Sequence, residues 1–416
     1  MLSDDLFLMP SVRQFIETVQ EDLADGFSVV VMMQHGVPKD ITPAYIASRV
    51  QEQLRHREMR YHPVSTRPTE DIVSHLAKAV NVTWETERTS QTLRNLMRAR
   101  NVPRILYLNG LERCQPEEVP NWLSMLPRWG TYADELLDEG VDAPSLLAIL
   151  PPSYAPYVPE GDGRLRVHWW WGFPSALEMQ LLCRMRNTTG SDPWQNTLLP
   201  PLVGSDVRLL KHLYHRLREI TDLTSVLAAY AKDQGWSAEQ LSALDVTARV
   251  QNANITPLNR APAKDLRDLW ALGLVCWTPE YQLEAHSAAL ALLGNKSEIS
   301  HRIWRGQAQL LLPQIDYLRL HVCSLLTAEF GDDWTYRWQK PLTEEEMDAL
   351  SETPYAIQLG HLSVLLRYRD ELKAFSEWWS VVEQARRLRN KIAHYQTITA
   401  NEYQALQRDM KRLNVH

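Results

Sequence analysis

The 416-residue sequence predicts a multidomain, mainly α-helical protein with an α/β domain at its N-terminus. Three observations predict this fold class. Short apolar runs alternate with helical patterns over residues 1–198, strand patterns become rare over 199–304, and residues 305–416 are helical almost throughout. We therefore expect an α/β domain, a helical middle domain and a C-terminal all-α bundle with these boundaries.

The α/β domain is predicted from four apolar runs. A helix over residues 11–25 precedes the first run, Phe27–Met33. The other runs are Arg104–Leu108, Ser145–Pro152 and the more irregular Arg166–Gly172. Continuous apolar runs separated by helices are typical of parallel strands that are covered on both faces. We expect a parallel sheet between layers of helices.

The middle region combines helices with one short hairpin. Residues Gly204–Leu217 open a helix whose first N–H groups Ser205 or Asp206 can cap. Within Asp265–Leu293 a helix ends at Gly273, and two short segments that look like a small hairpin follow. Helices followed by a hairpin resemble a winged-helix module. Such modules bind DNA in some proteins and act as spacers inside multidomain ATPases in others.

The C-terminal region is predicted to be a helical bundle. One long helix covers Arg305–Gly331, in which Pro313 demands a kink or an early helix start. A short helix follows over Thr343–Leu350. A final pair of helices runs from about His361 to Ala393 and from Thr399 to Leu413.

Composition excludes several classes of protein. The net charge is −7, so any contact with nucleic acid must come from a local patch. The four cysteines lie tens of residues apart, without the spacing of a zinc or redox site. No apolar run approaches a membrane span, and the N-terminus lacks the basic start of a secretory signal. We expect a cytoplasmic protein with no metal, no cofactor and no membrane contact.

The segment after the first strand, QHGVPKDIT over residues 34–42, lies where a nucleoside triphosphatase has its phosphate loop. Gly36, Lys39 and Thr42 are present, but not in the order GxxxxGK[ST]. Pro38 also removes a backbone N–H from the turn that should donate to phosphate. The sequence therefore predicts no ATP hydrolysis.

The next strand and its exit, RILYLNGLERC, add to this comparison. Glu112 lies where an acid could activate water, whereas Asn109 replaces the metal-binding Asp. In strand order and spacing the N-terminal third resembles a degenerate P-loop ATPase of the AAA+/STAND kind. The resemblance implies a domain that has lost hydrolysis and kept its shape for partner contact. An unrelated α/β domain is the alternative.

The C-terminal segment ARRLRNKIAHYQTIT follows an amphipathic pattern, with apolar residues at steps of three, four and seven. With Leu388 at 0° and about 100° per residue, Ile392 and Tyr395 fall within about 40° of it, on the buried side. The polar residues fall on the side turned away from the core, at about 100°, 200° and 240°: Arg389, Asn390 and His394.

This polar face has the groups that cleave RNA without metal. His394 can transfer a proton to or from the reacting ribose oxygens. Arg389 can hold the scissile phosphate, and Asn390 can orient the imidazole or bind phosphate. Residues 380–416 carry seven Lys/Arg and three Asp/Glu, a local charge of +4 that favours a phosphate backbone. Ala393 between them lets the helix of a second copy approach closely.

The six residues Arg389–His394 look like the RNxxxH motif of HEPN domains. Residues 311–334 are similar to the first long helix of that family and its exit, and residues 361–379 to the helix before the motif. The resemblance covers 305–416. It implies a helical homodimer and, in many members, metal-independent RNase activity in toxin or phage-defence systems.

On this resemblance Arg389 and His394 are the catalytic pair, Asn390 lies beside the Arg, and Asp316 is a candidate supporting acid. We expect cleavage to leave 2′,3′-cyclic phosphates and further protein partners to come from the same operon. The first alternative is a non-catalytic HEPN adaptor in a multi-protein defence complex. The second is a DNA-binding regulator that uses the middle domain, although the helix LRDLWALGL is not basic.

Overall fold

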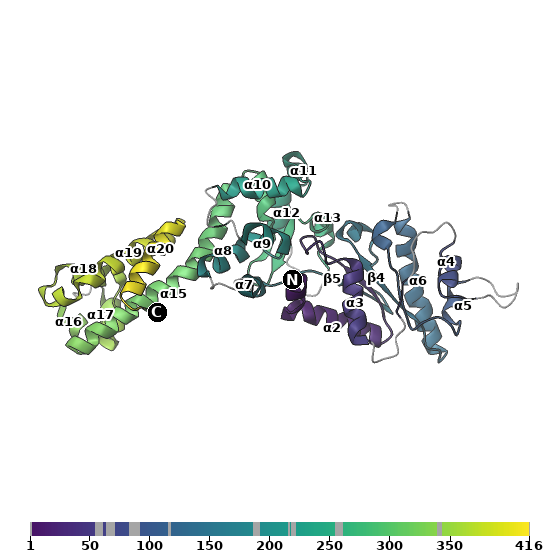
Figure 1. Ribbon diagram of the computed structural model, residues 1–416, viewed down its shortest axis with the longest axis horizontal. Helices are drawn as coiled ribbons and strands as arrows, with labels where there is room; N and C mark the ends of the chain where they lie inside the picture. The colour runs from purple at the N-terminus through teal and green to yellow at the C-terminus, as the bar shows by residue number, and fades with distance from the viewer. Residues whose placement is uncertain are drawn as a thin grey trace. The chain divides into compact units, whose positions relative to one another are not determined.

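The computed structural model describes residues 2–54, 61–63, 71–82, 92–114, 118–185, 192–214, 217, 222–253, 261–338 and 343–415. It confirms a mainly helical chain with a parallel sheet in its N-terminal part. The chain divides into two compact units (Figure 1). The N-terminal unit comprises Met1–Arg186, Val203–His215 and Asp222–Gly294, and the C-terminal unit comprises Asn187–Leu202, Arg216–Thr221 and Asn295–His416. The separate domain over 199–304 stays a prediction.

The N-terminal unit is built on a five-stranded sheet in the order β2-β3-β4-β1-β5, with every pair parallel. The strands are β1 (Ser28–Met32), β2 (Tyr61–Pro63), β3 (Ile105–Tyr107), β4 (Ser145–Leu150) and β5 (Leu165–Trp169). Central β1 is buried along its whole length, as its unbroken apolar run predicts. The four predicted strands are confirmed, whereas the short β2 has no apolar run and was not predicted.

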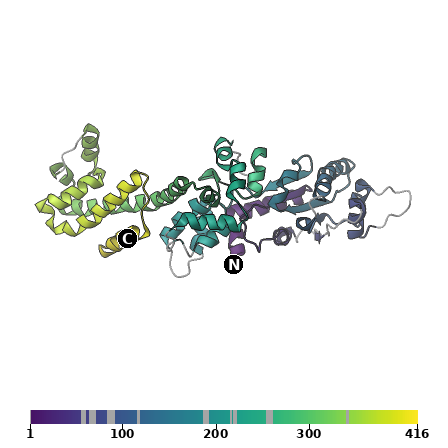
Figure 2. The ribbon, with the colours of Figure 1, turned by 90° about the horizontal axis from the view of Figure 1, so that it is seen from above.

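Helices pack against this sheet. The largest are α2 (Pro10–Ala24), α3 (Pro43–Leu54) and α6 (Val119–Asp138), all of which contact its strands (Figures 1 and 2). Helix α2 buries Val12, Ile16 and Val19, three or four residues apart, so one apolar stripe faces the sheet. Shorter helices complete this part: α1 (Leu2–Phe7), α4 (Ile72–Ala79), α5 (Leu93–Met97) and α7 (Ala176–Met185).

The rest of the N-terminal unit is helical, with one hairpin. The helices are α9 (Val207–Tyr214), α10 (Leu223–Asp233), α11 (Ala238–Ala243), α12 (Val246–Asn252), α13 (Arg267–Ala271) and α14 (Ser287–Leu292). Strands β6 (Val275–Thr278) and β7 (Gln282–Ala285) pair antiparallel, which confirms the predicted hairpin. Asp206 caps α9 as predicted, because its Oδ1 accepts the N–H groups of Arg208 at 2.8 Å and Leu209 at 2.9 Å.

The regular structure of the C-terminal unit is helical throughout its described residues. It contains α8 (Pro193–Val203), α15 (Lys296–Phe330), α16 (Trp334–Trp338), α17 (Glu344–Glu352), α18 (Leu359–Tyr368), α19 (Ser376–Ala393) and α20 (Ala400–Arg412). Helix α15 continues through Pro313 and ends at Gly331, where φ is +81°. It starts before the predicted Arg305, because the Asn295 side chain accepts the N–H of Glu298 and caps it.

The single helix predicted over 361–393 is wrong. The chain leaves helical geometry at Arg369, and a 3₁₀ segment over Asp370–Phe375 separates α18 from α19. The apolar spacing is kept across this break, since Leu365, Leu372 and Val382 are all buried. Spacing alone therefore did not reveal that the backbone turns between them.

Helix α8 belongs to the core of the C-terminal unit. Trp194 and Leu198 are buried in one cluster with residues of α15 and α20, and the Trp194 ring stacks on that of Tyr403 at 5.1 Å. A Cβ at Gly306 of α15 would lie 2.8 Å from the carbonyl oxygen of Thr197, so glycine permits this close approach. No helix of the described residues is long and apolar enough to cross a lipid bilayer.

Candidate functional site

Helix α19 carries the predicted site residues on its outer face. Its buried side includes Val381, Ala385 and Leu388, which anchor the helix in the core of the C-terminal unit. The side chain of Arg389 is exposed and that of Asn390 is half-buried. The amphipathic spacing thus placed both residues correctly, away from the apolar stripe.

The end of α19 differs from the prediction. The helix ends at Ala393, His394 is its exposed C-cap residue, and Tyr395 takes a left-handed backbone with φ of +57°. Tyr395 is therefore not on the buried stripe, and its side chain is 70% exposed. The indole Nε1 of Trp304 donates to the carbonyl oxygen of Ile392 at 2.7 Å, which satisfies one of the last acceptors of the helix.

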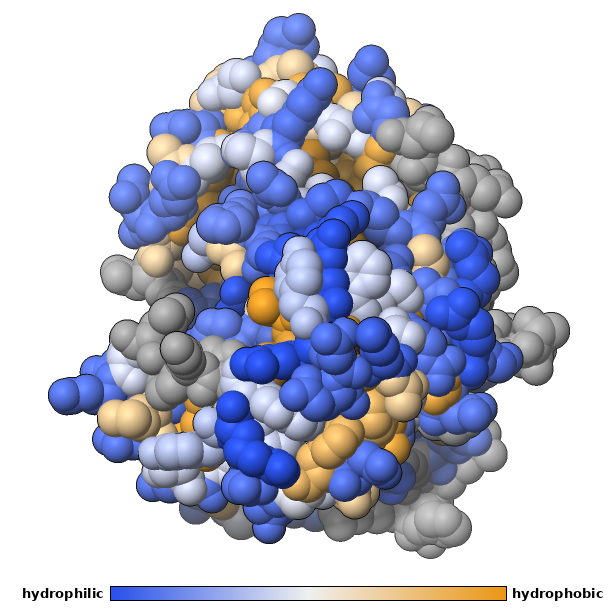
Figure 3. Space-filling view, turned by 90° about the vertical axis from the view of Figure 1, so that its left-hand side faces the viewer, coloured by the Kyte–Doolittle hydropathy of each residue, from blue (hydrophilic) through white to orange (hydrophobic). Residues whose placement is uncertain are grey.

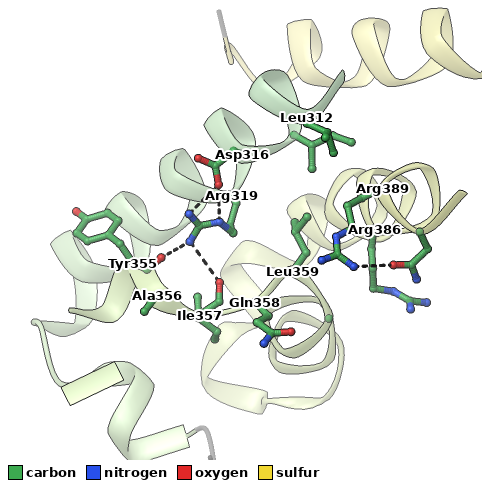
Figure 4. Close-up of a pocket in the computed structure, with 13 residues that line it drawn as sticks. Leu312, Asp316, Arg319, Tyr355, Ala356, Ile357, Gln358, Leu359, Arg386 and Arg389 are labelled. Atoms are coloured by element: carbon green, nitrogen blue, oxygen red, sulfur yellow. Dashed lines mark hydrogen bonds and ion pairs between the residues drawn. The ribbon is translucent and has the colours of Figure 1, made fainter. Parts of the chain in front are cut away.

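Arg389, Asn390 and Asp316 line one groove of about 460 Å³ (Figure 4). Its walls come from α15, from residues 355–360 before and at the start of α18, and from α19. In Figure 4 the Asp316 and Arg389 side chains lie on opposite walls. His394 is not among the lining residues, so within one copy of the chain three of the four predicted residues come together.

The carboxylate of Asp316 is held by Arg319. Oδ1 of Asp316 accepts Nη2 of Arg319 at 2.7 Å and Nε at 2.9 Å. Arg319 also donates to the backbone carbonyls of Tyr355 and Ile357, the latter at 3.3 Å. Asp316 therefore orients Arg319, and Arg319 in turn holds the part of the groove wall formed by residues 355–357.

Sequence reasoning did not identify Arg319 or residues 355–360. Arg319 follows Asp316 by three residues and so shares its helix face, a spacing that could have identified the pair. Residues 355–360 had no such signal, because they reach the groove through a 3₁₀ turn, Pro354–Ala356, and the first turn of α18.

The arginines of α19 differ in their partners. Arg386 and Arg387 both donate to Glu383, at 2.7 Å and 3.1 Å. The hydrogen bond from Arg386 lowers the pKa of Glu383 to about 2, helped by the Ser363 hydroxyl. Within the part of the chain that the structure describes, Arg389 has no carboxylate partner and meets only Oδ1 of Asn390, at 3.5 Å. Its positive charge is therefore open to an external anion.

The crevice at the end of β1 in the N-terminal unit is closed by the protein itself. Gly36 takes φ of +90°, and a Cβ there would lie 2.9 Å from Oδ1 of Asp206. The N–H of Arg208 donates to the Gly36 carbonyl at 3.0 Å. The carboxyl ends of parallel strands are where ligands usually bind, but here the N-terminus of α9 occupies that position.

His35 completes this closure. A guanidinium nitrogen of Arg208 lies 2.9 Å from its Nδ1, and a Cβ at Gly273 would lie 2.4 Å from the same atom. Burial, reinforced by the charge of Arg208, lowers the pKa of His35 to about 4, so the ring is neutral at pH 7 and accepts this contact. Lys39, the loop residue that would meet phosphate, points to solvent.

The structure also shows where Glu112, the candidate water-activating acid, lies in the N-terminal unit. Glu112 lies in a 3₁₀ turn and pairs with Arg113 at 3.3 Å. Among the described residues, no group of three His, Cys, Asp or Glu side chains is arranged to hold a metal ion.

No protein-family model matches the chain, and a search of curated proteins finds no match either.

Proposed function

We propose that the C-terminal unit is a HEPN-like endoribonuclease that cuts RNA without metal, in a bacterial anti-phage or toxin-type protein. The observation that carries this proposal is the environment of Arg389. It is exposed, it lines a groove, and no described carboxylate neutralises it, whereas Arg386 and Arg387 on the same helix share Glu383. A fixed cation left unpaired beside a cavity is suited to bind phosphate.

In the proposed reaction Arg389 binds the scissile phosphate and stabilises the charge that develops in the transition state. His394 transfers the proton, either from the ribose 2′-hydroxyl or to the 5′-oxygen that leaves. Attack by the 2′-oxygen leaves a 2′,3′-cyclic phosphate. Asn390 lies between the two in sequence and orients Arg389 through its Oδ1.

The proposal includes a homodimer through α19. Arg389 and His394 lie well apart around the helix, and His394 does not line the groove. Two copies related by a twofold axis would bring the His394 of one copy toward the Arg389 of the other. Ala393 is exposed between them and is small enough for a close helix contact. We also expect protein partners from the same operon.

The N-terminal unit is proposed to be a degenerate AAA+/STAND-like domain. A parallel sheet in which β1 lies between β4 and β5 supports this, and so does the position of the Gly36 loop after β1. Since Asp206 and His35 fill the crevice, the domain serves as a scaffold for partner contact instead of a motor.

A second candidate function is a non-catalytic adaptor. The observation that favours it is a set of large apolar side chains at the surface of α15 and α18, between 37% and 68% exposed: Leu312, Tyr317, Leu320, Val364 and Tyr368. In Figure 3, hydrophobic groups lie in small patches on an otherwise hydrophilic face. Such side chains suit contacts with a partner protein.

The test compares RNA cleavage by the purified full chain, alone and with its operon partners, in EDTA. Arg389→Ala and His394→Ala should each reduce cleavage by about 10²–10⁴-fold, the usual cost of removing a positioned catalytic group. Arg387→Ala is the matched control, because it removes another exposed arginine of α19, one that does not line the groove. Product ends should carry 2′,3′-cyclic or 3′-phosphate.

Folding of each variant is checked by thermal unfolding, since exposed substitutions usually cost within about 0.5 kcal/mol. Loss of cleavage and of growth arrest in the two site variants, with the control active, supports the nuclease. Wild-type protein that cuts no RNA, together with variants that keep full biological activity, would favour the adaptor.

A further inference from the structure

Tyr395 has an unusual backbone for an aromatic residue. The described part of the chain has five non-glycine residues with positive φ, and Tyr395 is the only aromatic one; the others are Asn81, Asp245, Gln282 and Asn414. Asparagine and aspartate tolerate this conformation, whereas a bulky side chain is disfavoured there. The position immediately follows His394, so the strained residue adjoins the proposed site.

The hydrogen bonds around Tyr395 are those of a Schellman motif. The N–H of Gln396 donates to the carbonyl of Lys391 at 2.9 Å, and the N–H of Tyr395 donates to that of Ile392 at 3.1 Å. The left-handed residue of this motif is usually glycine. Tyrosine at this position therefore makes the end of the helix less stable than glycine would. Helix stability does not explain why an aromatic ring is placed here.

The ring of Tyr395 belongs to an aromatic cluster at the surface. It makes a tilted contact with the Trp304 ring, at 4.7 Å between ring centres and 39° between ring planes. Trp304 in turn stacks on the exposed His301 at 5.3 Å and 20°. The indole of Trp304 is fixed by its hydrogen bond to Ile392. Trp304 thus contacts the tyrosine ring on one side, while Tyr395 remains 70% exposed to solvent.

An exposed aromatic ring beside cationic groups is how proteins hold unpaired bases. Residues 380–416 carry a local charge of +4, and the unpaired Arg389 lies on the same helix. Among the described residues 393–397, Tyr395 is the one exposed large apolar side chain, whereas the core of a protein interface usually contains several. The chemistry at this helix end favours single-stranded RNA.

We propose that Tyr395, supported by Trp304, stacks on a base of single-stranded RNA next to the phosphate that is cleaved. This inference rests on the proposed nuclease function and adds a positioning residue to it. Stacking holds the chain in an unpaired conformation beside His394, so that a ribose 2′-oxygen can align with the phosphate. Double-stranded RNA, whose bases are already stacked, should bind poorly at this ring.

The test uses Tyr395→Gly in the His394→Ala background, so that RNA is bound and not cut. Glycine suits the left-handed backbone, so the variant should fold at least as stably as its parent. Its affinity for a short, fluorescently labelled single-stranded RNA of mixed sequence should fall about 5- to 150-fold, measured by anisotropy. Tyr395→Phe keeps the ring and should bind like the parent.

Tyr336→Ala is the matched control, because this tyrosine of α16 is 60% exposed and lies outside the aromatic cluster. Unchanged affinity in Tyr395→Gly, or no binding of single-stranded RNA by the parent, would overturn the inference. Loss of a dimer in Tyr395→Gly, with RNA affinity unchanged, would also overturn it and assign the ring to a protein contact.

The same variant with His394 intact separates the inference from the nuclease proposal. Stacking predicts a raised KM for single-stranded RNA. If Tyr395→Gly cleaves RNA as well as wild type does, the stacking role is refuted and the nuclease proposal is kept. If wild type cuts no RNA, but its binding of single-stranded RNA is lost in Tyr395→Gly, the nuclease proposal is refuted and the stacking role is kept.

Discussion

Nε2 of His286 lies 3.2 Å from Oδ2 of Asp206, and both side chains are almost completely buried in the N-terminal unit. Nδ1 of His286 accepts the N–H of Ala288, which leaves Nε2 to donate to the carboxylate. The hydroxyl of Tyr230 donates to the same oxygen at 2.8 Å. Asp206 thereby joins α9, α10 and the start of α14 at one point.

We predict that Asp206→Ala lowers the free energy of unfolding of the N-terminal unit by about 3 kcal/mol or more, because several buried donors lose a charged acceptor. Urea unfolding followed by tryptophan fluorescence measures this. Asp71→Ala is the control, since Asp71 is an exposed N-cap of α4, whose loss typically costs about 1 kcal/mol. Equal losses in the two variants would contradict the joining role.

The ion pairs of Glu383 predict a pH dependence of stability. The hydrogen bond from Arg386 holds the pKa of Glu383 at about 2 in the folded protein, below its ordinary value of 4.5. A lowered pKa stabilises the fold above pH 4.5, and this contribution is lost as the pH falls toward 2.

The stability difference between wild type and Glu383→Gln should therefore be largest near neutral pH and shrink below pH 4.5. Glu377→Gln, at an exposed position of the same helix, controls for the loss of a surface charge. A difference that stays constant from pH 7 to pH 3 would rule out this role for Glu383.

The groove beside Arg389 can be filled without disturbing the fold. A Cβ at Gly360 of α18 meets no atom within 4 Å, and Gly360 lines the groove. Gly360→Leu should reduce kcat/KM for RNA at least about tenfold, the effect of about 1.4 kcal/mol. Its thermal stability should not fall, because leucine is the better helix former.

Val364→Leu, one turn further along α18 and outside the groove, is the matched control for this substitution. If Gly360→Leu cleaves RNA as well as Val364→Leu does, the RNA does not enter the groove.

The oligomeric state tests the proposed pairing of two α19 helices. Wild type should be a dimer at micromolar concentration by light scattering. Ala393→Phe should shift it to a monomer and reduce cleavage, because the large ring separates the two helices. An intact dimer in this variant would place the interface elsewhere, and a monomeric wild type, with and without RNA, would exclude the dimer.

The closed crevice of the N-terminal unit predicts an absence of ATP turnover. Phosphate release by wild type should equal the background of a protein-free sample, and Lys39→Ala should not change it, because Lys39 points to solvent. Turnover that disappears in Lys39→Ala would contradict this prediction.

Apolar patterns predicted much of the fold, because a strand covered on both faces is an unbroken apolar run and a helix buries every third or fourth residue. The run over β1 and the buried Leu388 of α19 are examples. The same argument failed for Tyr395, since periodicity assumes that a helix continues and cannot detect a left-handed residue after Ala393. Strand β2 was missed because three residues are too few for a period.

The candidate site was predictable only where its residues share one helix. Arg389 and Asn390 follow from the pattern of α19 alone. The groove wall over 355–360 and the closure of the β1 crevice by Asp206 depend on contacts between residues far apart in the chain. No local pattern in a single sequence encodes such contacts.

Helix α8 has a consequence for the order of events on the ribosome. It belongs to the C-terminal unit, yet most of the residues from 203 to 294 that follow it belong to the other unit. At about 5–20 residues per second, roughly 5–20 s separate the synthesis of Trp194 from that of its partners on α15. During this interval the apolar side chains of α8 lack the residues of α15 and α20 that bury them, so α8 is the segment of the nascent chain where we expect a chaperone to bind.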